Sequence, residues 1–276
     1  MCQEFTWFEG ICVHMSIEIH NEDCFETMTR LPQGSVGTIL TSPPYNTNRK
    51  MGRKKTVTDL DSSKGFSYLR YDTQQDTMTN GEYVHFTLRL FDGFNRILAP
   101  NGCVLYNMSY GTENTEAMIR SVSAVVEHTP FTVADIIVWK KPSAMPVNQN
   151  RNRLTRICEF VYVFCRKSES ATFNCNKKVT SVRKTGQRMY ESITNFVEAR
   201  NNDGPCPYNK ATYSTELCEK LLSLYATEGS CVYDPFSGSG TTAVACKKMG
   251  LPFVGSELSA NQVAWSLERL GAGDAE

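Results

Sequence analysis

The chain has 276 residues, of which 41% are hydrophobic and 21% charged, and its formal net charge is zero. These values are typical of one large α/β domain, or of one catalytic domain with an inserted module, and they exclude a largely disordered chain. No apolar run reaches the roughly 20 residues of a membrane span, and residues 1–14 lack the apolar centre of a signal peptide.

The first elements of the chain alternate between strand and helix. Residues 16–19 alternate in polarity and predict a strand, and Asn21 is a suitable N-cap for a helix that ends near Arg30. The apolar run 36–40 predicts a second strand, which must stop at Pro43 because proline cannot continue a strand ladder. The turn after it therefore lies at the carboxyl end of a strand, where open α/β sheets bind ligands.

A long polar stretch separates these elements from the next ones. Residues 47–80 are basic and lack apolar periodicity, which predicts a mobile loop of the kind that is functional or disordered. Helical spacing and apolar runs then predict a further series of elements. They are a helix at 81–98, a strand at 103–108, a helix at 112–127, and strands at 132–139 and 157–165.

Two further segments, 141–156 and 166–208, are polar and basic and predict irregular structure. After them the alternation returns. It comprises a helix at 214–226, a strand at 231–233, a helix at 241–249, a strand at 251–255 and a helix at 259–270. This alternation predicts an α/β fold with a doubly wound, mostly parallel sheet and helices on both faces.

Positive charge is concentrated in two stretches. Residues 139–190 hold twelve lysines and arginines but two acids, so their net charge is +10 and that of the remainder is −10. The second stretch places five cations within seven residues. They are Arg49, Lys50, Arg53, Lys54 and Lys55. Two such stretches in a neutral protein favour contact with a polyanion over two solvated faces.

The cysteines and histidines point away from disulfides and metal. The eleven cysteines are an odd number with no CxxC spacing, and the four histidines are scattered. We therefore expect reduced thiols, as in the cytoplasm, and no metal site.

Residues 234–242 read Asp-Pro-Phe-Ser-Gly-Ser-Gly-Thr-Thr, between a predicted strand and a predicted helix. Gly238 and Gly240 allow a tight turn and a close approach of the backbone to a ligand. Glu257 follows the next strand, where a carboxylate can accept hydrogen bonds from both hydroxyls of a ribose. A phosphate-binding P-loop is excluded because Thr241 stands in the place of its lysine.

A second motif, residues 41–46, reads Thr-Ser-Pro-Pro-Tyr-Asn at the end of the second predicted strand. Its two prolines fix a rigid turn, with the polar acceptor Ser42 before them and the aromatic Tyr45 after them. Taken alone, this turn also fits an ordinary strand that ends at proline.

Together the motifs resemble those of the DNA amino-methyltransferases, which methylate cytosine N4 or adenine N6 with S-adenosylmethionine. The family signatures (D/N/S)PPY and FxGxG match residues 42–45 and 236–240. The first motif precedes the second by about 190 residues, as in the permuted β group of the family. The resemblance covers residues 16–270 and implies a class I, Rossmann-like methyltransferase sheet with a basic target-recognition insert.

The resemblance also implies roles for single residues. The catalytic set is Ser42, Pro43, Pro44 and Tyr45. The cofactor-binding set is Asp23, Cys24, Ala211, Tyr213, Asp234, Phe236, Ser237, Gly238, Gly240, Thr241, Glu257 and Leu258. The two basic stretches, and not the resemblance, supply the expected DNA-binding set, which is Arg49, Lys50, Arg53, Lys54, Lys55, Arg151, Arg153 and Arg156. Residues 209–214 are similar to the HPAxFP stretch of the family, with Asn209 for His, Lys210 for the first Pro and Ser214 for the last.

The chemistry of this reaction accounts for the catalytic residue types. The amino nitrogen of a base is a weak nucleophile because its lone pair is delocalised into the ring. The Ser42 hydroxyl and the Pro43 carbonyl can accept its two N–H bonds, and Tyr45 offers a face on which a flipped-out base stacks. The methyl group then moves directly, with positioning and electrostatics as the main catalytic terms.

The target base stays open between cytosine N4 and adenine N6. Within the resembling family, serine before PPY is commoner among cytosine-N4 enzymes, which favours cytosine slightly. Asn46 after Tyr45 is familiar from adenine-N6 enzymes and points the other way.

Three other functions stand beside this one. A catalytically inactive, methyltransferase-like DNA-binding accessory protein would keep the fold, although both motifs are intact here. A protein-glutamine methyltransferase has its two motifs in the reverse order. A cytosine-C5 methyltransferase needs a cysteine nucleophile, for which Cys206 is the nearest candidate.

These expectations divide the chain into four parts. Residues 1–14 form an N-terminal extension, 15–140 the catalytic half, 141–208 the target-recognition insert and 209–276 the cofactor-binding half. The expected partner is double-stranded DNA, while a homodimer and a cognate restriction endonuclease stay open. The resemblance implies the cytoplasm of a bacterial or phage-infected cell, with no membrane contact.

Overall fold

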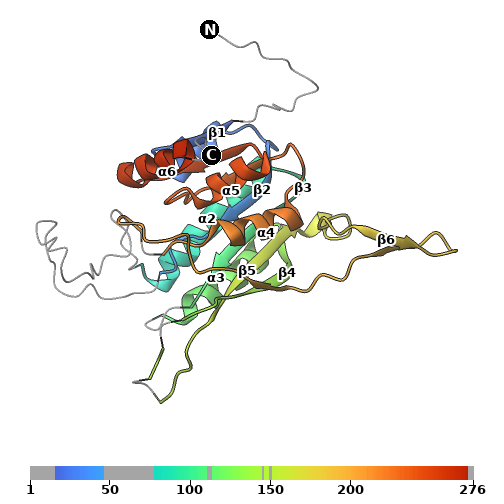
Figure 1. Ribbon diagram of the computed structural model, residues 1–276, viewed down its shortest axis with the longest axis horizontal. Helices are drawn as coiled ribbons and strands as arrows, with labels where there is room; N and C mark the ends of the chain where they lie inside the picture. Colours follow the sequence, from blue (N-terminus) through green and yellow to red (C-terminus); the bar gives the residue numbers. More distant parts are fainter. Residues whose placement is uncertain are drawn as a thin grey trace, which may run out of the picture.

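The protein folds around an eight-stranded sheet (Figure 1) with the strand order β1-β10-β9-β2-β3-β5-β4-β8. The computed structural model describes residues 16–46, 78–110, 114–144, 146–148, 151–209 and 211–272. The strands are β1 Ile17–His20, β2 Val36–Thr41, β3 Leu98–Met108, β4 Phe131–Lys140, β5 Cys158–Arg166, β8 Phe196–Glu198, β9 Cys231–Asp234 and β10 Phe253–Ser256.

The sheet is mostly parallel, as the sequence predicts. Strands β1, β10, β9, β2 and β3 are parallel neighbours, and β8 is parallel to β4, whereas β5 is antiparallel to both β3 and β4. In the central strand β2, the side chains of Val36, Ile39 and Leu40 are at most 1% exposed. A strand that is covered on both faces reads as a continuous apolar run, which is how β2 was recognised.

Helices cover both faces of the sheet (Figure 1). One face carries α1 Cys24–Arg30, α2 Asn80–Ile97 and α3 Glu116–His128, and the other carries α4 Thr215–Tyr225, α5 Thr241–Met249 and α6 Ala260–Ala272. Two apolar cores result, one around Phe91 and Phe94 of α2 and the other around Leu221 of α4 and Phe253 of β10. The α/β, Rossmann-like fold class is thereby confirmed.

Side-chain caps fix where the helices begin. Thr79 and Glu82 form a reciprocal capping box at the start of α2, in which the Thr79 N–H donates to Glu82 Oε2 at 2.8 Å. Helix α1 is capped by Asp23, which accepts from the Phe25 N–H at 2.8 Å, and not by Asn21 as expected. The Asn21 side chain instead donates to two backbone carbonyls that follow β10.

Strand β3 begins at Leu98, before the expected start at Cys103. Val36 of β2 pairs with Leu98 and Thr38 pairs with Cys103, so the chain between them makes an excursion within the strand. Asn101 in this excursion has a left-handed φ of +56°. The proline–asparagine–glycine turn is therefore real, but it interrupts a strand that has already started.

Part of the region expected to be irregular is ordered. Within 166–208, a 3-10 turn, η2 Lys167–Glu169, is followed by a separate hairpin of β6 Val179–Val182 and β7 Arg188–Tyr190, and β8 joins the main sheet. The prediction was wrong for these strands because three or four residues are too few to show a period. The hairpin extends away from the sheet in Figure 1. The expected N-terminal extension and all but the last residues of the loop 47–80 lie outside the described residues.

Candidate functional site

The two sequence motifs meet at the carboxyl ends of adjacent strands. Strands β2 and β9 are parallel neighbours, so the turn after Thr41 lies beside the turn after Asp234. Thr41 Oγ1 donates to Asp234 Oδ1 at 2.9 Å and ties the last residues of the two strands together. Motifs that are far apart in the sequence thus share the sheet edge at which α/β folds bind ligands.

Asp234 is the centre of this junction and is fully buried. Its Oδ1 also accepts from the Phe236 N–H at 3.0 Å, and its Oδ2 accepts from the hydroxyls of Tyr213 at 3.1 Å and Thr242 at 2.7 Å. Burial raises the pKa of Asp234, while the four donors oppose this shift. Asp234 does not line the adjacent cleft, and its carboxylate holds together the turns that border the cleft.

A cleft opens between the glycine-rich turn and the turn at Ser42. It encloses about 570 Å³ of empty space, its open mouth included, which lies within the roughly 300–1,000 Å³ of small-molecule sites. We call it the glycine cleft. Its lining residues are Ser42, Pro44, Asn209, Ala211, Thr212, Tyr213, Phe236, Ser237, Gly238, Ser239, Thr241, Glu257 and Gln262.

The two glycines of the turn act differently. Both have left-handed backbones, with φ of +54° at Gly238 and +74° at Gly240. Gly238 lines the cleft, whereas a Cβ on Gly240 would lie 2.6 Å from Cβ of Ser266 in α6. Gly240 therefore allows α5 and α6 to pack closely, and it is not a lining residue as the cofactor assignment implied.

Polar groups converge on the glycine cleft from fixed positions. Glu257 Oε2 accepts from the Gly238 N–H at 2.9 Å, and Oε1 accepts from the Ser259 N–H at 2.8 Å. The buried Ser237 hydroxyl has no hydrogen-bond partner among the described residues. A buried polar atom without a partner is rare in folded proteins, and in a cleft it indicates a ligand that supplies the missing bond.

A second pocket adjoins the first, and we call it the Ser42 pocket. Four residues form the wall that both share: Ser42, Ala211, Thr212 and Tyr213. The remaining lining comes from β3, β4, β5, the turn after β2 and the segment before α4. It consists of Tyr45, Asn107, Trp139, Lys141, Glu159, Asn201 and Asn202.

A chain of polar contacts crosses the Ser42 pocket. Ser42 Oγ lies 2.8 Å from the Tyr45 hydroxyl, which donates to Glu159 Oε2 at 3.0 Å. Asn107 Nδ2 donates to the Tyr45 hydroxyl at 2.6 Å and to Glu159 Oε2 at 3.0 Å. The other oxygen of Glu159 forms an ion pair with Lys141. Three of these residues were not predicted as site residues because they lie in no sequence motif. They are Asn107, Lys141 and Glu159.

The carbonyl groups of the two prolines differ in their hydrogen bonds. The Pro43 carbonyl accepts no hydrogen bond from the described part of the chain, whereas the Pro44 carbonyl accepts from the Tyr83 hydroxyl at 2.6 Å. Of the two acceptors that the sequence predicts for an amino group, Ser42 lines both pockets, whereas Pro43 is buried and lines neither.

Asn46, which follows the prolines, serves the turn itself. Its φ is +51°, and its Nδ2 donates to the Met78 carbonyl at 2.9 Å. The Asn114 side chain in turn donates to the Asn46 carbonyl at 2.8 Å. Asn46 thus joins the ends of the chain on either side of residues 47–77.

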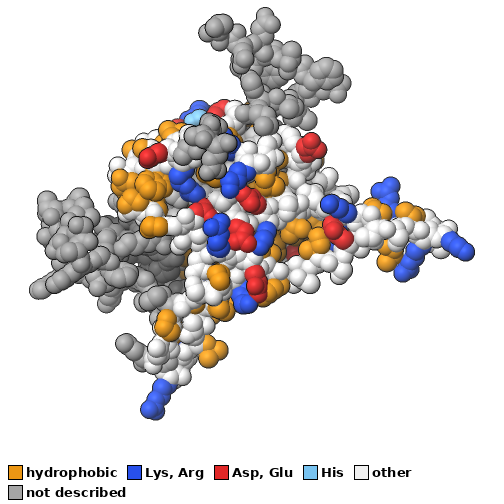
Figure 2. Space-filling model, viewed as in Figure 1, with side chains coloured by type: hydrophobic (Ala, Val, Ile, Leu, Met, Phe, Trp, Pro, Cys, Tyr) orange, Lys and Arg blue, Asp and Glu red, His pale blue; other side chains and the backbone are white. Residues whose placement is uncertain are grey.

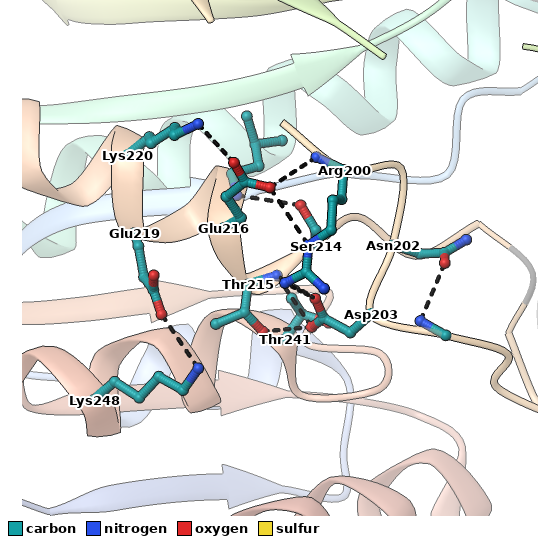
Figure 3. Close-up of polar contacts among 12 residues, drawn as sticks. Arg200, Asn202, Asp203, Ser214, Thr215, Glu216, Glu219, Lys220, Thr241 and Lys248 are labelled. Atoms are coloured by element: carbon teal, nitrogen blue, oxygen red, sulfur yellow. Dashed lines mark hydrogen bonds and ion pairs between the residues drawn. The ribbon is translucent and has the colours of Figure 1, made fainter. Parts of the chain in front are cut away.

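The segment 200–203, which brings two asparagines to the Ser42 pocket, is fastened to the start of α4 (Figure 3). Both carboxylate oxygens of Asp203 accept from the Thr215 N–H at 3.0 Å. Arg200 pairs with Glu216 at 3.4 Å. These contacts place the pocket wall relative to the sheet.

Comparison with known proteins agrees with this geometry. A sequence model of the N6_N4_Mtase family, described as DNA methylase, matches residues 36–268. The chain belongs to this family. Both turns that meet at the sheet edge lie within the matched range, so this methylase is of the cytosine-N4 or adenine-N6 type.

Two curated relatives span nearly the whole methylase. The Type II methyltransferase M.Cfr9I of Citrobacter freundii is 26% identical over 91% of this chain and 87% of its own length. The Type II methyltransferase M.XycI of Xanthomonas campestris pv. cyanopsidis is 24% identical over 90% of this chain and 85% of its own length.

Solved structures share the fold. The PvuII DNA methyltransferase, named as cytosine-N4-specific, has a TM-score of 0.66 at 19% identity and covers 91% of this chain and 85% of its own. The complex of M1.HpyAVI with S-adenosylmethionine has a TM-score of 0.56 at 24% identity and covers 92% of this chain and 100% of its own. At these identities the likeness concerns the fold of the methylase.

The glycine cleft gathers most of the expected cofactor residues. Those that line it are Ala211, Tyr213, Phe236, Ser237, Gly238, Thr241 and Glu257. Those that do not are Asp23, Cys24, Asp234, Gly240 and Leu258. Asp23 is used as the cap of α1, Cys24 is buried, and Leu258 is 45% exposed. The lining residues that we missed are Asn209, Thr212, Ser239 and Gln262. Of these, Asn209 had a signal in the sequence, because it stands at the histidine position of the HPAxFP stretch.

The expected DNA-binding residues fall into three groups. Arg49, Lys50, Arg53, Lys54 and Lys55 lie outside the described residues. Arg151 and Arg153 are exposed, on the loop between β4 and β5. Arg156 is half-buried, donates to the Tyr110 carbonyl and lies 4.9 Å from the centre of the Tyr110 ring. Arg156 thus differs from Arg151 and Arg153 in its burial and in its contacts.

The basic segment 139–190 is also divided in space. Arg166 donates to the carbonyls of Leu98 and Ala99, and Lys167 to those of Val126 and Thr129, so both serve the fold. Five other cations lie on the projecting hairpin or beside it, where Figure 2 shows several blue side chains. They are Lys177, Lys178, Arg183, Lys184 and Arg188.

Two features are absent from the described residues. No helix among them is long and apolar enough to cross a membrane. Nor do the described ranges contain a cluster of three His, Cys, Asp or Glu side chains that could hold a metal ion.

Proposed function

We propose that this methylase transfers the methyl group of S-adenosylmethionine to cytosine N4 of a base flipped out of double-stranded DNA. The observation that carries the proposal is the shared wall of the two pockets. A cofactor in the glycine cleft and a base in the Ser42 pocket would meet at Ser42, Ala211, Thr212 and Tyr213. Two ligands that exchange a group must adjoin in this way.

The glycine cleft fits S-adenosylmethionine in its chemistry. The Glu257 carboxylate suits the two hydroxyls of a ribose, and the unpartnered Ser237 hydroxyl suits a polar group of the ligand. The half-buried Phe236 offers an apolar wall. A structural relative, M1.HpyAVI, was solved in complex with this cofactor. When bound, S-adenosylmethionine supplies an electrophilic methyl group.

The turn at Ser42 orients the amino group of the base. The Ser42 hydroxyl and the open Pro43 carbonyl accept its two N–H bonds, which draws the nitrogen out of conjugation with the ring. The lone pair then points out of the ring plane, and the Tyr45 ring supports the base by stacking. No covalent nucleophile from the protein takes part. The proton that the methylated nitrogen must release can pass from Ser42 through the Tyr45 hydroxyl to the Glu159 carboxylate.

Two observations favour cytosine over adenine. Serine stands before the prolines, and PvuII DNA methyltransferase, named as cytosine-N4-specific, shares the fold. Asn46, the residue that points to adenine, donates from its side chain to the Met78 carbonyl in the turn.

The test is to express the protein in a host without DNA methylation and to analyse the hydrolysed DNA by mass spectrometry. We expect N4-methylcytosine from the wild type and, in Ser42→Ala, a loss of rate of roughly 10²–10³-fold, as for other preorganised polar groups. Ser42→Ala should bind S-adenosylmethionine normally in calorimetry, and Ser35→Ala, a surface serine, should behave as wild type. N6-methyladenine alone would overturn the cytosine assignment, and C5-methylcytosine or no methylated base would overturn the mechanism.

The other functions fit the structure less well. A cytosine-C5 mechanism would need Cys206, which lines neither pocket. An inactive accessory protein would not require Ser42 in the wall that two pockets share, and failure to bind S-adenosylmethionine would be its signature. The division into halves 15–140 and 209–276 around the insert 141–208, a homodimer, a cognate restriction endonuclease and a cytoplasmic location stay proposals.

A further inference from the structure

The wall of the Ser42 pocket holds a lysine that the proposed chemistry has not used. Lys141 follows directly after β4, and its ammonium group pairs with Glu159 of β5. The side chains of this pair are 22% and 12% exposed, whereas those of the neighbouring pair Lys140–Glu198 are 39% and 63% exposed. A cation that is largely withdrawn from water and faces a pocket is suited to bind a ligand.

Lys141 is also the donor with the most capacity left. Among the buried and half-buried nitrogen donors of the pocket, Trp139 Nε1 donates to a backbone carbonyl at 3.1 Å and Asn201 Nδ2 to another at 3.0 Å. Asn107 Nδ2 already faces three oxygens of the polar chain. The Lys141 ammonium has three N–H groups, contacts the Glu159 carboxylate and lies 4.6 Å from the centre of the Trp139 ring, so it retains N–H donors for a bound molecule.

We propose that Lys141 donates a hydrogen bond to the ring nitrogen beside the amino group of the flipped base, which is N3 of cytosine. This inference rests on the proposed function, because it requires an amino base in the Ser42 pocket. Lys141 is then a specificity-determining residue for the methyl transfer. Glu159 is a positioning residue, since it holds both the Lys141 ammonium and the Tyr45 hydroxyl.

The pattern of donors and acceptors gives this contact its selectivity. Cytosine and adenine present an amino donor beside a ring-nitrogen acceptor, whereas thymine and guanine present a carbonyl acceptor beside a ring N–H donor. The acceptors at Ser42 and Pro43, followed by the donor at Lys141, complement the first pattern. With thymine or guanine, the acceptors would face a carbonyl oxygen and the Lys141 donor would face a ring N–H. The pocket would therefore reject keto bases as well as accept amino bases.

The experiment pairs a protein variant with a base analogue. The recognition site is first located by sequencing DNA methylated by the wild type, and duplexes are then made with cytosine or 3-deazacytosine at the target. The analogue keeps the amino group and lacks the ring-nitrogen acceptor. We expect kcat/KM of the wild type to fall about 10- to 100-fold on the analogue, the range for a hydrogen bond to a charged group. Lys141→Met should show the same fall on natural DNA and no further fall on the analogue.

Three controls separate this role from folding and from general charge. Lys140→Met removes the adjacent exposed cation and should leave both rates unchanged. Lys141→Arg keeps a donor and should restore part of the selectivity for cytosine over the analogue. Lys141→Met/Glu159→Gln avoids an unpaired carboxylate, and its S-adenosylmethionine binding and thermal unfolding should match those of the wild type.

The outcomes are distinct. Equal rates of the wild type on cytosine and 3-deazacytosine overturn this inference and leave the proposed function standing. The inference is also overturned if Lys141→Met still loses kcat/KM on 3-deazacytosine as the wild type does, while its slope of DNA binding against salt falls by about one unit. Lys141 would then contact a phosphate and not the base. A wild type that methylates no cytosine overturns the proposed function, and this inference with it.

Discussion

The glycine cleft and the Ser42 pocket share a wall, yet they are built by different means. The glycine cleft is shaped by backbone: left-handed turns at Gly238 and Gly240, the buried junction at Asp234 and the amides that fix Glu257. The Ser42 pocket is shaped by side chains that bond to one another in series, from Ser42 to Lys141. Changes in the first should therefore alter stability and cofactor affinity, and changes in the second should alter the chemistry on the base.

The largest expected effect lies at the junction of the two regions. Asp234→Ala leaves four donors without an acceptor and should lower the free energy of unfolding by about 4 kcal/mol, measured by urea denaturation. Asp234→Asn should lose less, because the hydroxyls of Thr41, Tyr213 and Thr242 can rotate to accept from an amide. Equal losses in the two variants would contradict the assignment of Asp234 as an acceptor centre.

The same residue predicts a pH dependence. Burial raises the pKa of Asp234, so the folded protein binds this proton more tightly than the unfolded chain does. The stability from this group is thus present below its unfolded pKa, near 4, and is lost as the pH rises through the folded pKa. The advantage of wild type over Asp234→Asn should therefore shrink as the pH rises above about 4. If the stability advantage of the wild type instead grew with pH, the pKa of Asp234 would be lowered by folding and not raised.

The next effect tests whether backbone shape alone builds the glycine cleft. Gly240→Ala places a Cβ 2.6 Å from Ser266 at a φ of +74°, and it should cost about 3 kcal/mol of stability. Gly34→Ala is the matched control, because its φ is +69° and no atom lies within 4 Å of the added Cβ. The control should cost about 1 kcal/mol, and equal costs would show that the contact with α6 is unimportant.

A smaller effect concerns ligand affinity in the glycine cleft. Glu257→Ala removes the proposed ribose acceptor and should weaken S-adenosylmethionine binding by roughly 1.5–3 kcal/mol in calorimetry. At saturating cofactor, the rate on DNA should remain within a few-fold of wild type, which separates this site from Ser42. Glu219→Ala, on the surface of α4, serves as the control. Unchanged binding in Glu257→Ala would remove the ribose assignment.

The smallest effect extends the comparison to DNA. Arg151→Ser/Arg153→Ser on the loop between β4 and β5 should reduce the slope of binding against salt by about two units, one for each lost phosphate contact. The matched pair Arg183→Ser/Lys184→Ser changes the projecting hairpin and should leave the slope unchanged. Equal changes in both pairs would show that DNA contacts both segments and that the basic insert acts as one surface.

The same contrast explains what the sequence could predict. Strand β2 and the helices α2, α4 and α5 were placed to within about two residues, because long apolar runs, helical spacing and end signals agree there. The glycine cleft was largely found as well, since its turn and carboxylate lie in two short local patterns. The cap of α1 was misplaced because Asn21 and Asp23 are both good caps, and the fold uses Asn21 to hold the chain after β10.

Only part of the Ser42 pocket was predicted, because its other residues are brought together by the register of paired strands. Glu159 lies opposite Trp139 in the antiparallel pair of β4 and β5, which brings it close to Lys141. No local pattern reports which residue of one strand faces which residue of another, because register depends on the whole pair and its turn. Asn107 on β3 was not predicted as a site residue for the same reason. A sequence therefore shows sites built from turns more readily than sites built across strands.

The two outermost strands of the sheet set a limit on how this protein can associate. The strands β1, of four residues, and β8, of three residues, are the edges of the eight-stranded sheet. The short β1 offers few unpaired backbone groups to a strand added from another chain. On the other side, β8 pairs only with residues 138–140, so most of β4 has no strand neighbour there among the described residues. A homodimer that lengthened the sheet would consequently have to add its strand beside residues 131–137 of β4 and not beside β1.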